Sequence, residues 1–276
     1  MSLLNNKTIF ITGASRGIGR AIALRCAKDG ANVVIAAKSD QPHPKLPGTI
    51  HSVAAEVEAA GGKALAIKLD VRDDKAIEAA IALTVETFGG LDALINNASA
   101  IQLTSAQDTE LKRFDLIHSI NTRGVLACSK AAAPHLKKAK NPHIITLSPP
   151  INLGKNWLGG YIPYTVTKYS MSLLALGLAE ELRADGVSSS TLWPQTTIAT
   201  AAVEFTVDKN LMKHSRTPEI MADAAYEILI TENQTLSGEN LIDETLLRDR
   251  GVNEFDVYKH DPECTDLFMD LYIDPA

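Results

Sequence analysis

Tyr164 and Lys168 are side chains whose types and spacing suit the movement of a proton. They lie four residues apart in a segment with a helical pattern, which puts the phenol and the ammonium group on one face of a helix. An ammonium group beside a phenol favours the phenolate and lowers the pKa of the tyrosine. The pair therefore predicts a proton donor or acceptor that works near neutral pH.

A glycine-rich turn near the N-terminus indicates a nucleotide site. The stretch Thr12–Gly19 reads T-G-A-S-R-G-I-G and separates the apolar run Thr8–Ile11 from a helical pattern. Gly13 permits a tight turn, Gly17 lets the backbone approach a pyrophosphate, and Gly19 lets the helix pack closely on the strand. The N-terminus of that helix offers free N–H groups and the positive end of its dipole to phosphates.

The residues after the second apolar run favour NADP(H) over NAD(H). A site for NAD carries an acid here to hold the ribose 2′-hydroxyl, whereas this sequence has Ala37 followed by Lys38. Arg16 in the glycine turn adds a second cation, and two cations without a carboxylate suit a 2′-phosphate. The alternative is that both cations are solvated surface charges.

Polar residues also follow the third and fourth apolar runs. Asp70, which precedes Val71, is placed to accept a hydrogen bond from an adenine amino group. Asn96 and Asn97 follow the fourth run. Asparagine favours turns on structural grounds alone, but a doubled Asn at a strand end predicts that the backbone is held beside a cofactor.

The elements that must position these residues are apolar runs alternating with helical patterns. The expected strands are Thr8–Thr12, Asn32–Ala36, Ala64–Lys68, Ala93–Asn96, His143–Leu147, Val187–Leu192 and Glu239–Ile242. The expected helices are Gly17–Asp29, Ile50–Ala60, Asp74–Phe88, Ser105–Leu116 continuing through Asn121–Lys137, Tyr164–Arg183 and Pro218–Leu229. Strand alternating with helix predicts an α/β fold with a single Rossmann-like, doubly wound parallel sheet of about seven strands and helices on both faces. Ligands bind such a sheet at the carboxyl ends of its strands.

Composition excludes several classes of partner. The 276 residues are 45% hydrophobic, which suits one large domain with a sizeable core. No apolar run reaches the roughly 18 residues that a membrane span needs, and the N-terminus lacks the apolar region of a signal peptide. We therefore expect no membrane span and a cytoplasmic protein.

The net charge is concentrated in the C-terminal tail. Residues 251–276 carry seven acidic side chains and one Lys, so the net charge of −6 lies there. The sequence shows no basic face, so nucleic acid is not an expected partner.

Metal binding and disulfides are not predicted either. The seven His residues show no metal spacing, and the pattern His260-Asp261-x-x-Cys264 is interpreted as a turn in the tail. The three Cys residues have no paired spacing, which indicates free thiols. Cys26 and Cys128 lie in apolar helical patterns, so we expect them to pack in the core.

Together these motifs resemble those of the short-chain dehydrogenase/reductase family. T-G-x-x-x-G-x-G, Asp70-Val71, Asn96-Asn97-Ala98, Asn121 and Tyr164-x-x-x-Lys168 occur in the family's order, and the resemblance covers about residues 7–245. It implies NADP(H)-dependent hydride transfer between nicotinamide and the carbonyl or alcohol carbon of a small hydrophobic substrate, such as a steroid-like compound, a fatty acyl compound or another ketone. The closest resemblance is to members with an added sterol-carrier domain, for which we expect no room here.

The resemblance implies a role for each matching residue. Tyr164 exchanges a proton with the substrate oxygen, Lys168 holds the nicotinamide ribose and lowers the phenol pKa, and Asn121 anchors a water that links Lys168 to solvent. The residues expected to bind the cofactor are Gly13, Ser15, Arg16, Gly17, Ile18, Gly19, Lys38, Asp70, Val71, Asn97, Tyr164, Lys168, Pro194, Ile198 and Thr200.

The sequence departs from the family pattern at three positions, and the first is Ser99, which replaces the glycine that usually follows Asn96-Asn97-Ala98. Ser148 is the nearest match to the catalytic serine, but it lies farther from Tyr164 than is usual, and Pro149 replaces the second serine. We expect Ser148 to be catalytic; the alternative is that it ends a strand, with its hydroxyl bonded to nearby backbone. Gln195 replaces the glycine that usually follows Pro194, which adds a side chain near the nicotinamide.

The remaining expectations concern organisation. Residues 1–250 form the NADP-binding oxidoreductase domain, and residues 251–276 form an acidic tail packed on it. The apolar segment Ala201–Arg216 would be a substrate lid, and the family implies a homodimer or homotetramer. A stripe on the Tyr164 helix, Met171, Leu174, Leu178 and Leu182, faces either the sheet or a partner helix. The alternatives to an oxidoreductase are a cofactor-binding protein with little turnover and a non-redox lyase or isomerase on the same fold.

Overall fold

Seven parallel strands form one sheet in the order β3-β2-β1-β4-β5-β6-β7. The protein is described from a computed structural model that covers residues 2–274. The strands are β1 (Thr8–Thr12), β2 (Asn32–Ala37), β3 (Lys63–Lys68), β4 (Ala93–Asn96), β5 (His143–Thr146), β6 (Ser188–Trp193) and β7 (Asn240–Ile242). The order runs outward from β1 to β3 and then returns to β4 on the other side of β1. The switch point of this doubly wound sheet therefore lies between β1 and β4, and the predicted fold class is confirmed.

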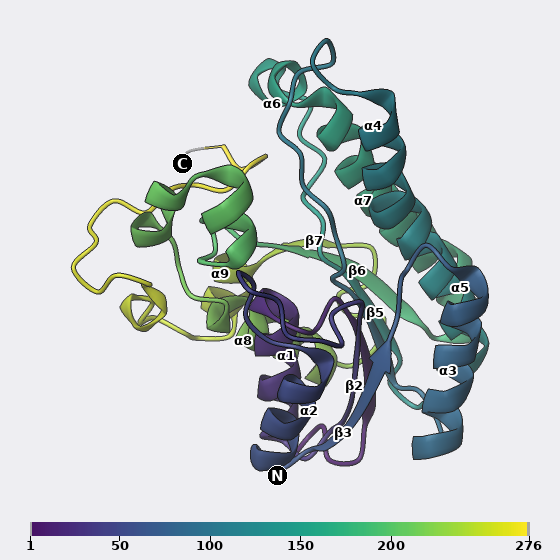
Figure 1. Cartoon of the computed structure of the whole chain (residues 1–276). Coiled ribbons are helices and arrows are strands. Elements are labelled where there is room, and N and C mark those ends of the chain that lie inside the picture. The colour runs from purple at the N-terminus through teal and green to yellow at the C-terminus, as the bar shows by residue number, and fades with distance from the viewer. Residues whose placement is uncertain (1, 275–276) are drawn as a thin grey trace.

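Helices cover both faces of the sheet (Figure 1). One layer contains α1 (Gly17–Ala27), α2 (Ile50–Ala59) and α8 (Glu219–Ile230), and the other contains α3 (Asp74–Phe88), α5 (Gly124–Leu136) and α7 (Ile162–Glu181). Successive strand residues point to opposite layers. Ile9 and Ile11 of β1 pack with the first layer, whereas Phe10 packs with the second. This double burial explains why the strands are continuous apolar runs.

The helical segment expected to begin at Ser105 begins later. The Ser105 hydroxyl donates to the Asp108 carboxylate at 2.6 Å and accepts from the Asp108 N–H at 3.2 Å, and such local bonds compete with a helix. As a result, α4 spans only Leu111–His118. It continues into the π-helical turn η1 (Ser119–Arg123), which contains Asn121, before α5 begins.

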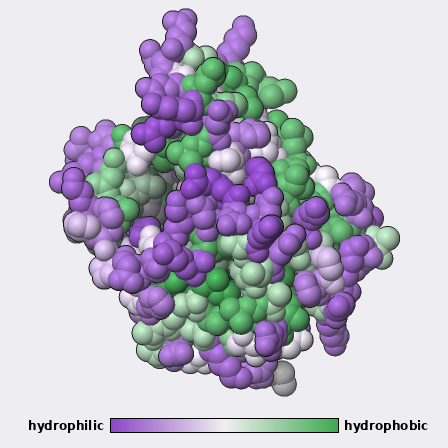
Figure 2. All heavy atoms as spheres, turned by 45° about the vertical axis from the view of Figure 1, so that its right-hand side comes forward, coloured by the Kyte–Doolittle hydropathy of each residue, from purple (hydrophilic) through white to green (hydrophobic). Residues whose placement is uncertain are grey.

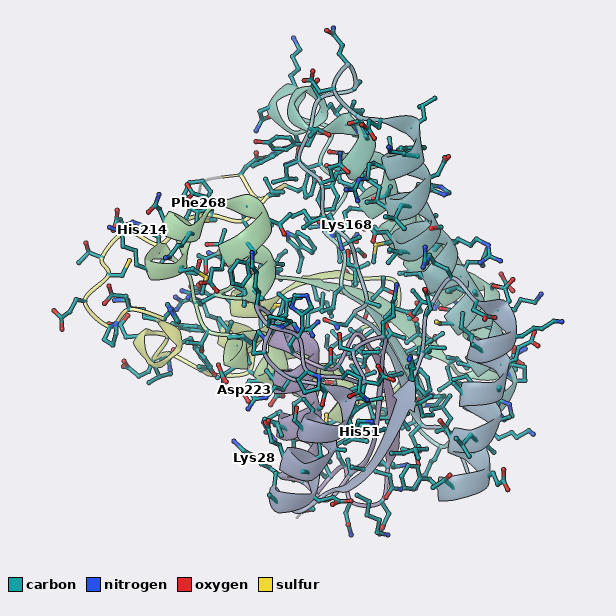
Figure 3. The ribbon with its side chains drawn as sticks, viewed as in Figure 1. Lys28, His51, Lys168, His214, Asp223 and Phe268 are labelled. Carbon is teal, nitrogen blue, oxygen red and sulfur yellow. The ribbon has the colours of Figure 1, made fainter. Side chains whose placement is uncertain are left out.

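The structure also contains short elements that the sequence analysis did not predict. They are α6 (Lys155–Gly160), η2 (Arg183–Asp185), η3 (Val203–Val207), η4 (Lys209–His214), α9 (Asp243–Asp249) and η5 (Asp256–Tyr258). The lid segment that contains η3 and η4 lies beside the C-terminal tail, drawn in yellow in Figure 1. In Figure 3, His214 of the lid and Phe268 of the tail lie next to each other, where the Phe268 N–H donates to the His214 carbonyl at 2.9 Å. No helix within residues 2–274 is long and apolar enough to cross a membrane.

The leucine stripe of α7 faces the body of the molecule. Leu178 and Leu182 pack in the same cluster as Phe10, and Met171 is fully buried. The outer side of the helix instead exposes Val166 and Leu173. Figure 2, which turns this side of the molecule forward, shows apolar patches among hydrophilic side chains.

The three cysteines are buried free thiols. Cys26, a residue of α1, packs in the core cluster on one side of the sheet, and Cys128 packs in the cluster on the other side. Burial raises the pKa of both thiols to about 12. The predicted core packing of these two residues is confirmed.

Candidate functional site

The glycine turn joins β1 to α1 at the switch point. Gly13 adopts a φ of 68°, and a side chain there would bring a Cβ atom within 2.8 Å of the Asn97 Nδ2 atom. A Cβ atom at Gly19 would lie 2.5 Å from the same nitrogen. At Gly17 the nearest atom would be the Thr200 methyl group, 3.5 Å away. Gly13 and Gly19 are therefore needed for close packing, whereas the outer side of Gly17 is open to a ligand.

Thr12 and Asn97 hold the two strands of the switch point together. The Thr12 hydroxyl accepts the backbone N–H groups of Asn97 and Ala98, each at 3.0 Å. The Asn97 side chain donates to the Thr12 carbonyl at 2.7 Å. The backbone is held here as expected, while its place beside a cofactor stays a prediction. The sequence analysis missed the positioning role of Thr12, although this residue opens the glycine motif. The other predicted residues of the turn lie close by, with Ser15 buried and Ile18 packed against the core.

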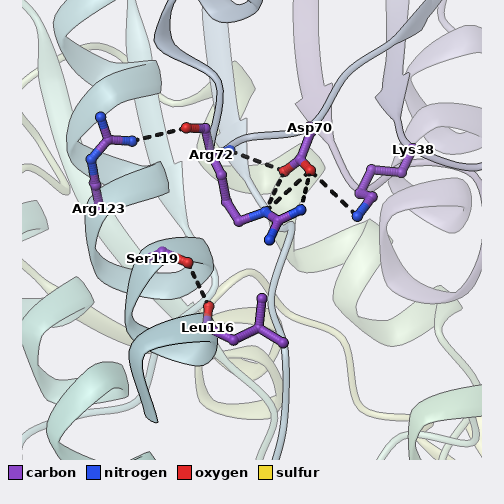
Figure 4. Close-up of polar contacts among 6 residues, drawn as sticks. All are labelled: Lys38, Asp70, Arg72, Leu116, Ser119 and Arg123. Carbon is purple, nitrogen blue, oxygen red and sulfur yellow. Dashed lines mark hydrogen bonds and ion pairs between the residues drawn. The ribbon is translucent and has the colours of Figure 1, made fainter. Parts of the chain in front are cut away.

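A group of charged side chains lies where β2 and β3 end (Figure 4). The Asp70 carboxylate lies 2.6 Å from Arg72 Nη2 and 3.3 Å from Lys38 Nζ. The hydrogen bonds from Arg72 hold the pKa of Asp70 well below its usual range, and Lys38 adds to the effect. Sequence analysis missed Arg72, although it lies only two residues after Asp70. Next to it, Val71 is buried against Gly124.

Arg16 anchors the proline-rich loop 39–48 to the glycine turn. Its Nε atom donates to the Pro47 carbonyl at 2.9 Å, and its Nη2 atom donates to the Ser39 hydroxyl at 2.9 Å and to the Gly48 carbonyl at 3.2 Å. The guanidinium group therefore lies at the border of the region where Lys38 is found. The loop therefore uses several of the hydrogen-bond donors of Arg16. The sequence analysis considered only the charge of this residue and did not predict these bonds.

Asn121 joins the loop after β4 to α7. Its Oδ1 atom accepts from the Ala100 N–H at 2.8 Å and from the Ser99 hydroxyl at 3.1 Å. Its Nδ2 atom donates to the Ala100 carbonyl and to the Thr167 hydroxyl, each at 3.0 Å. The side chain is fully buried, and its bond to Thr167 ties it to the residue that precedes Lys168 on α7. The water link implied for Asn121 stays a prediction.

Tyr164 and Lys168 are buried one helical turn apart on α7, with 4% and 3% of their surfaces exposed. Figure 3 places Lys168 between α7 and the sheet. Its Nζ atom donates to the Leu147 carbonyl at 2.7 Å and lies 4.8 Å from the centre of the Trp193 ring. Within residues 2–274, no hydrogen bond joins the Tyr164 hydroxyl to Lys168 or Ser148.

The pKa of Tyr164 differs from the expectation. Burial raises this pKa well above its ordinary value, and the neighbouring Tyr272 and Asp270 act in the same direction. Burial also lowers the pKa of Lys168 to about 7, while the charge of Asp270 opposes that change. The expected lowering of the tyrosine pKa considered only the attraction between the two side chains. Removal of both groups from water is the larger effect in the structure.

Ser148 follows β5 and is fully buried. Its N–H donates to the Thr146 carbonyl at 2.9 Å, but its hydroxyl has no hydrogen-bond partner within residues 2–274. The alternative in which this hydroxyl bonds to nearby backbone is therefore not what the structure shows. Ser172 donates instead to the carbonyl of Pro149, at 2.6 Å. A buried hydroxyl without a partner is costly, and the Ser148 hydroxyl is therefore free to donate to a bound group.

The segment after β6 completes the expected cofactor site. Pro194 follows the strand directly, and the Thr200 side chain faces Gly17 across the glycine turn. Ile198 is buried and pairs with Arg216. Gln195, in the position where the family has glycine, is held through its backbone: its N–H donates to Asp243 Oδ1 at 2.8 Å.

An aromatic cluster surrounds Tyr164, and its other buried members are Tyr169, Trp193 and Tyr272. Beside the cluster lies an apolar groove of about 640 Å³ between α6 and the tail. The groove shares Trp157, Leu271 and Tyr272 with the cluster and its packing neighbours. Trp157 both lines the groove and packs against Tyr272. A second hollow, of about 320 Å³, lies near Asp92 and His143, and no predicted site residue lines it.

One group of potential metal ligands connects the lid and the tail. His214 Nδ1, Cys264 Sγ and Asp266 Oδ1 lie within 4.8 Å of one another. The His214 nitrogen also lies 3.0 Å from the Asp266 carbonyl oxygen, so hydrogen bonding accounts for the contact. The sequence analysis had considered His260 with Cys264 instead; the absence of a metal stays a prediction.

Comparisons with known proteins agree with this geometry. Residues 7–210 match the family described as short chain dehydrogenase. Hydroxysteroid dehydrogenase-like protein 2 from Danio rerio is 52% identical over 267 residues, and the human protein of that name is 49% identical over 268 residues. These matches cover 97% and 96% of this chain but only 64% of each relative, so the chain spans less than two thirds of their length.

Solved structures extend the comparison to the fold. A Xanthomonas campestris protein is 51% identical, with a TM-score of 0.94 and 99% of each chain covered. A short chain dehydrogenase from Mycobacterium thermoresistibile is 52% identical, with a TM-score of 0.93, covering 98% of this chain and 96% of the other. A short chain dehydrogenase from Mycobacterium paratuberculosis bound to NAD is only 21% identical, with a TM-score of 0.72 and coverage of 87% and 96%; this likeness concerns the fold alone.

Proposed function

The chain belongs to the short-chain dehydrogenase/reductase family, and we propose that it is an NADP(H)-dependent oxidoreductase acting on the carbonyl/alcohol pair of a small hydrophobic substrate. The observation that carries this proposal is the buried pair of Tyr164 and Lys168 at the carboxyl ends of the strands. In a doubly wound sheet this edge, next to the switch point, is where ligands bind.

The residues present fit a dinucleotide. The open side of Gly17 at the start of α1 leaves room for a pyrophosphate, which the helix N-terminus favours. Gly13 and Gly19 have no side chains, so the turn packs closely against Asn97 and the space at Gly17 stays open. When bound, the nicotinamide would supply or accept the hydride.

The preference for NADP(H) rests on charge. Lys38 and Arg72 bracket Asp70, so two cations face one carboxylate that they already neutralise. Lys38 keeps 63% of its side chain exposed and is therefore accessible to a 2′-phosphate. Arg16 and the Ser39 hydroxyl, 2.9 Å apart, border the same region and would add donors to the phosphate.

Tyr164 would move the proton. Its raised pKa keeps the phenol protonated, which suits it to protonate a carbonyl oxygen as the adjacent carbon is reduced. The Lys168 ammonium group, in its charged form, would stabilise the phenolate left behind. Ser148 would donate a second hydrogen bond to the same substrate oxygen.

The apolar groove beside the aromatic cluster supports a hydrophobic substrate. Trp157, Tyr161, Phe268 and Leu271 are among its lining residues. Such a surface gains from covering the apolar part of a steroid-like, fatty acyl or other ketone substrate. The curated relatives are named as hydroxysteroid dehydrogenase-like, which agrees with an apolar substrate without identifying it.

A homo-oligomer, dimer or tetramer, is proposed as the working form. The outward face of α7 exposes Leu173, and α5 exposes Leu126. Leucines exposed on neighbouring helices are suited to helix–helix packing with a second copy. The expected cytoplasmic location stays a prediction.

The test is a panel of aldehydes, ketones and alcohols with NADPH or NADP⁺, followed by absorbance of the reduced cofactor. We expect turnover of at least one apolar substrate. Tyr164→Phe should abolish that turnover and leave cofactor affinity within a few-fold, because only the transferable proton is lost. Lys168→Ala should impair both turnover and cofactor affinity. Full activity of Tyr164→Phe would exclude the proposed acid, and cofactor binding without turnover of any substrate would favour a binding protein.

A further inference from the structure

Backbone hydrogen bonds hold the end of the lid against the C-terminal tail. The Phe268 N–H donates to the His214 carbonyl at 2.9 Å, and the His260 N–H donates to the Ser215 carbonyl at 3.0 Å. These bonds lie on either side of tail residues 261–267 and so place that stretch opposite the end of η4. The main chain therefore determines which side chains meet between the lid and the tail.

Three side chains with atoms that bind metal ions meet there. His214 Nδ1 lies 3.7 Å from Cys264 Sγ and 3.2 Å from Asp266 Oδ1, and the sulfur and oxygen atoms are 3.7 Å apart. The lid contributes one of these atoms and the tail contributes two. Imidazole nitrogen, thiolate sulfur and carboxylate oxygen are the ligands that Zn²⁺ takes in proteins.

The separations of the three atoms match tetrahedral coordination. Zn²⁺ binds sulfur at about 2.3 Å and nitrogen or oxygen at about 2.0–2.2 Å. Tetrahedral angles then separate a sulfur ligand from a nitrogen or oxygen ligand by about 3.6 Å, and a nitrogen ligand from an oxygen ligand by about 3.4 Å. The observed distances differ from these values by no more than about 0.2 Å. One ion can therefore reach all three atoms without a change of the backbone.

The surroundings of the cluster favour zinc and leave it accessible. Cys264 is buried, and thiolate is a soft ligand that favours Zn²⁺ over Mg²⁺ or Ca²⁺. The Asp266 side chain is 77% exposed, and that of His214 is 26% exposed. A cation can therefore enter from the solvent. A water molecule would complete the coordination, since three protein ligands leave the fourth position open.

Protons and a metal ion would compete for the same atoms. His214 Nδ1 also lies 3.0 Å from the Asp266 carbonyl oxygen, to which it donates only when that nitrogen is protonated. The Cys264 thiol likewise needs its proton to donate to Asp266 Oδ1. Hydrogen bonding thus accounts for the cluster in its protonated form, and the same arrangement presents metal ligands once the protons are lost. Metal affinity should therefore rise with pH.

We infer that His214, Cys264 and Asp266 form a zinc site that joins the lid to the tail. Spacing along the chain predicts no metal here, because His214 precedes Cys264 by 50 residues. The inference departs from that prediction because folding brings the two segments together. It also goes beyond the proposed function, since the site includes none of the residues assigned to proton transfer or cofactor binding.

The test is titration of the full-length, reduced protein with Co²⁺, a spectroscopically visible substitute for Zn²⁺. We expect a thiolate-to-cobalt absorption band that saturates at roughly one Co²⁺ per chain and disappears when the more tightly bound Zn²⁺ is added. Cys264→Ser should abolish the band. His214→Gln should weaken Co²⁺ binding by at least about ten-fold, because even the loss of a group that only supports a ligand has that effect. Cys26 and Cys128 are buried in the core and cannot supply the thiolate.

His260→Gln is the matched control for the titration. It removes the histidine that the sequence pattern pairs with Cys264, and it should leave the Co²⁺ affinity unchanged. Absence of a thiolate band in the unsubstituted protein, or an unchanged Co²⁺ affinity in His214→Gln, would overturn the inference. So would an affinity that His260→Gln lowers and His214→Gln does not, because a different pair of ligands would then hold the ion.

A protease assay applies even if Cys264→Ser or His214→Gln does not fold. Lys213 is an exposed trypsin site next to His214, and a metal ion on that histidine should hold the lid against the tail. We expect Zn²⁺ to slow cleavage at Lys213 of the unsubstituted protein several-fold relative to cleavage at exposed Lys138, and more strongly at about pH 8 than at about pH 6. A ratio of the two cleavage rates that Zn²⁺ leaves unchanged would overturn the inference. Neither assay needs NADPH or substrate, so this failure would leave the proposed function intact.

Discussion

The ammonium nitrogen of Lys168 donates a hydrogen bond to the backbone carbonyl of Leu147, 2.7 Å away. This bond connects α7 to the end of β5, one residue before Ser148. It therefore fixes how the helix that carries Tyr164 sits relative to the candidate catalytic serine. It also provides a partner for a charge that burial would otherwise disfavour.

Ser148→Ala should reduce kcat by about 10²–10³, the usual effect of removing one donor to a developing oxyanion. The reason is that the Ser148 hydroxyl has no protein partner within residues 2–274 and is available to the substrate oxygen. Steady-state kinetics measure the effect, and Ser170→Ala on the exposed side of α7 is the matched control. A loss smaller than about ten-fold in a correctly folded variant would make Ser148 a structural residue.

Lys38→Asp and Arg72→Ala should each weaken NADPH binding by about ten-fold or more relative to NADH, because each removes a charged partner of the 2′-phosphate. Dissociation constants from fluorescence titration give the ratio for the two cofactors. Lys63→Ala, at the opposite end of β3, removes a cation far from the site and should not change this ratio. A ratio that also stays constant in both test variants would remove the basis for the NADP(H) preference.

Leu173→Asp should convert the proposed homo-oligomer to monomers, because it places a charge on the exposed apolar face of α7, where Leu173 is 60% accessible. Light scattering at micromolar concentration reports the mass. Val257→Asp introduces the same change at an exposed position in the tail and should leave the mass unaltered. A monomeric mass for the unsubstituted protein would refute the oligomer itself.

The free energy of unfolding should decrease in acid because His143 is buried in its neutral form. Burial lowers its pKa from 6.5 to about 4, so between these values the unfolded chain binds a proton that the folded chain does not. Stability is then lost as the pH falls through that window, by about 3 kcal/mol in total. Urea unfolding of His143→Gln should show a smaller loss than the unsubstituted protein.

The comparison between variants is necessary because other buried groups titrate in the same range. Asp243 and Asp270 have raised pKa values of about 6 and about 7, and they contribute the opposite pH dependence over part of the window. His51→Gln, at an exposed position on α2, is the control. Equal acid sensitivity in His143→Gln and His51→Gln would rule out the assignment to His143.

Local patterns were sufficient to predict the sheet and its glycine turn. A buried strand shows as a continuous apolar run, and the turn at Gly13 requires a residue that tolerates a positive φ. Both signals are contained in a few neighbouring residues. The start of α4 was missed for a local reason as well, because the hydrogen bonds of Ser105 compete with the helical pattern.

Only the tertiary structure decided the electrostatics of the site. The spacing of Tyr164 and Lys168 predicts that they are neighbours, but the direction of their pKa values depends on how completely other segments exclude water. The charge of Asp270, more than 100 residues away along the chain, also acts on both pKa values. Its influence could not be read from the sequence, because no periodicity or motif connects it to α7, and folding alone brings the acidic tail against the ends of the strands.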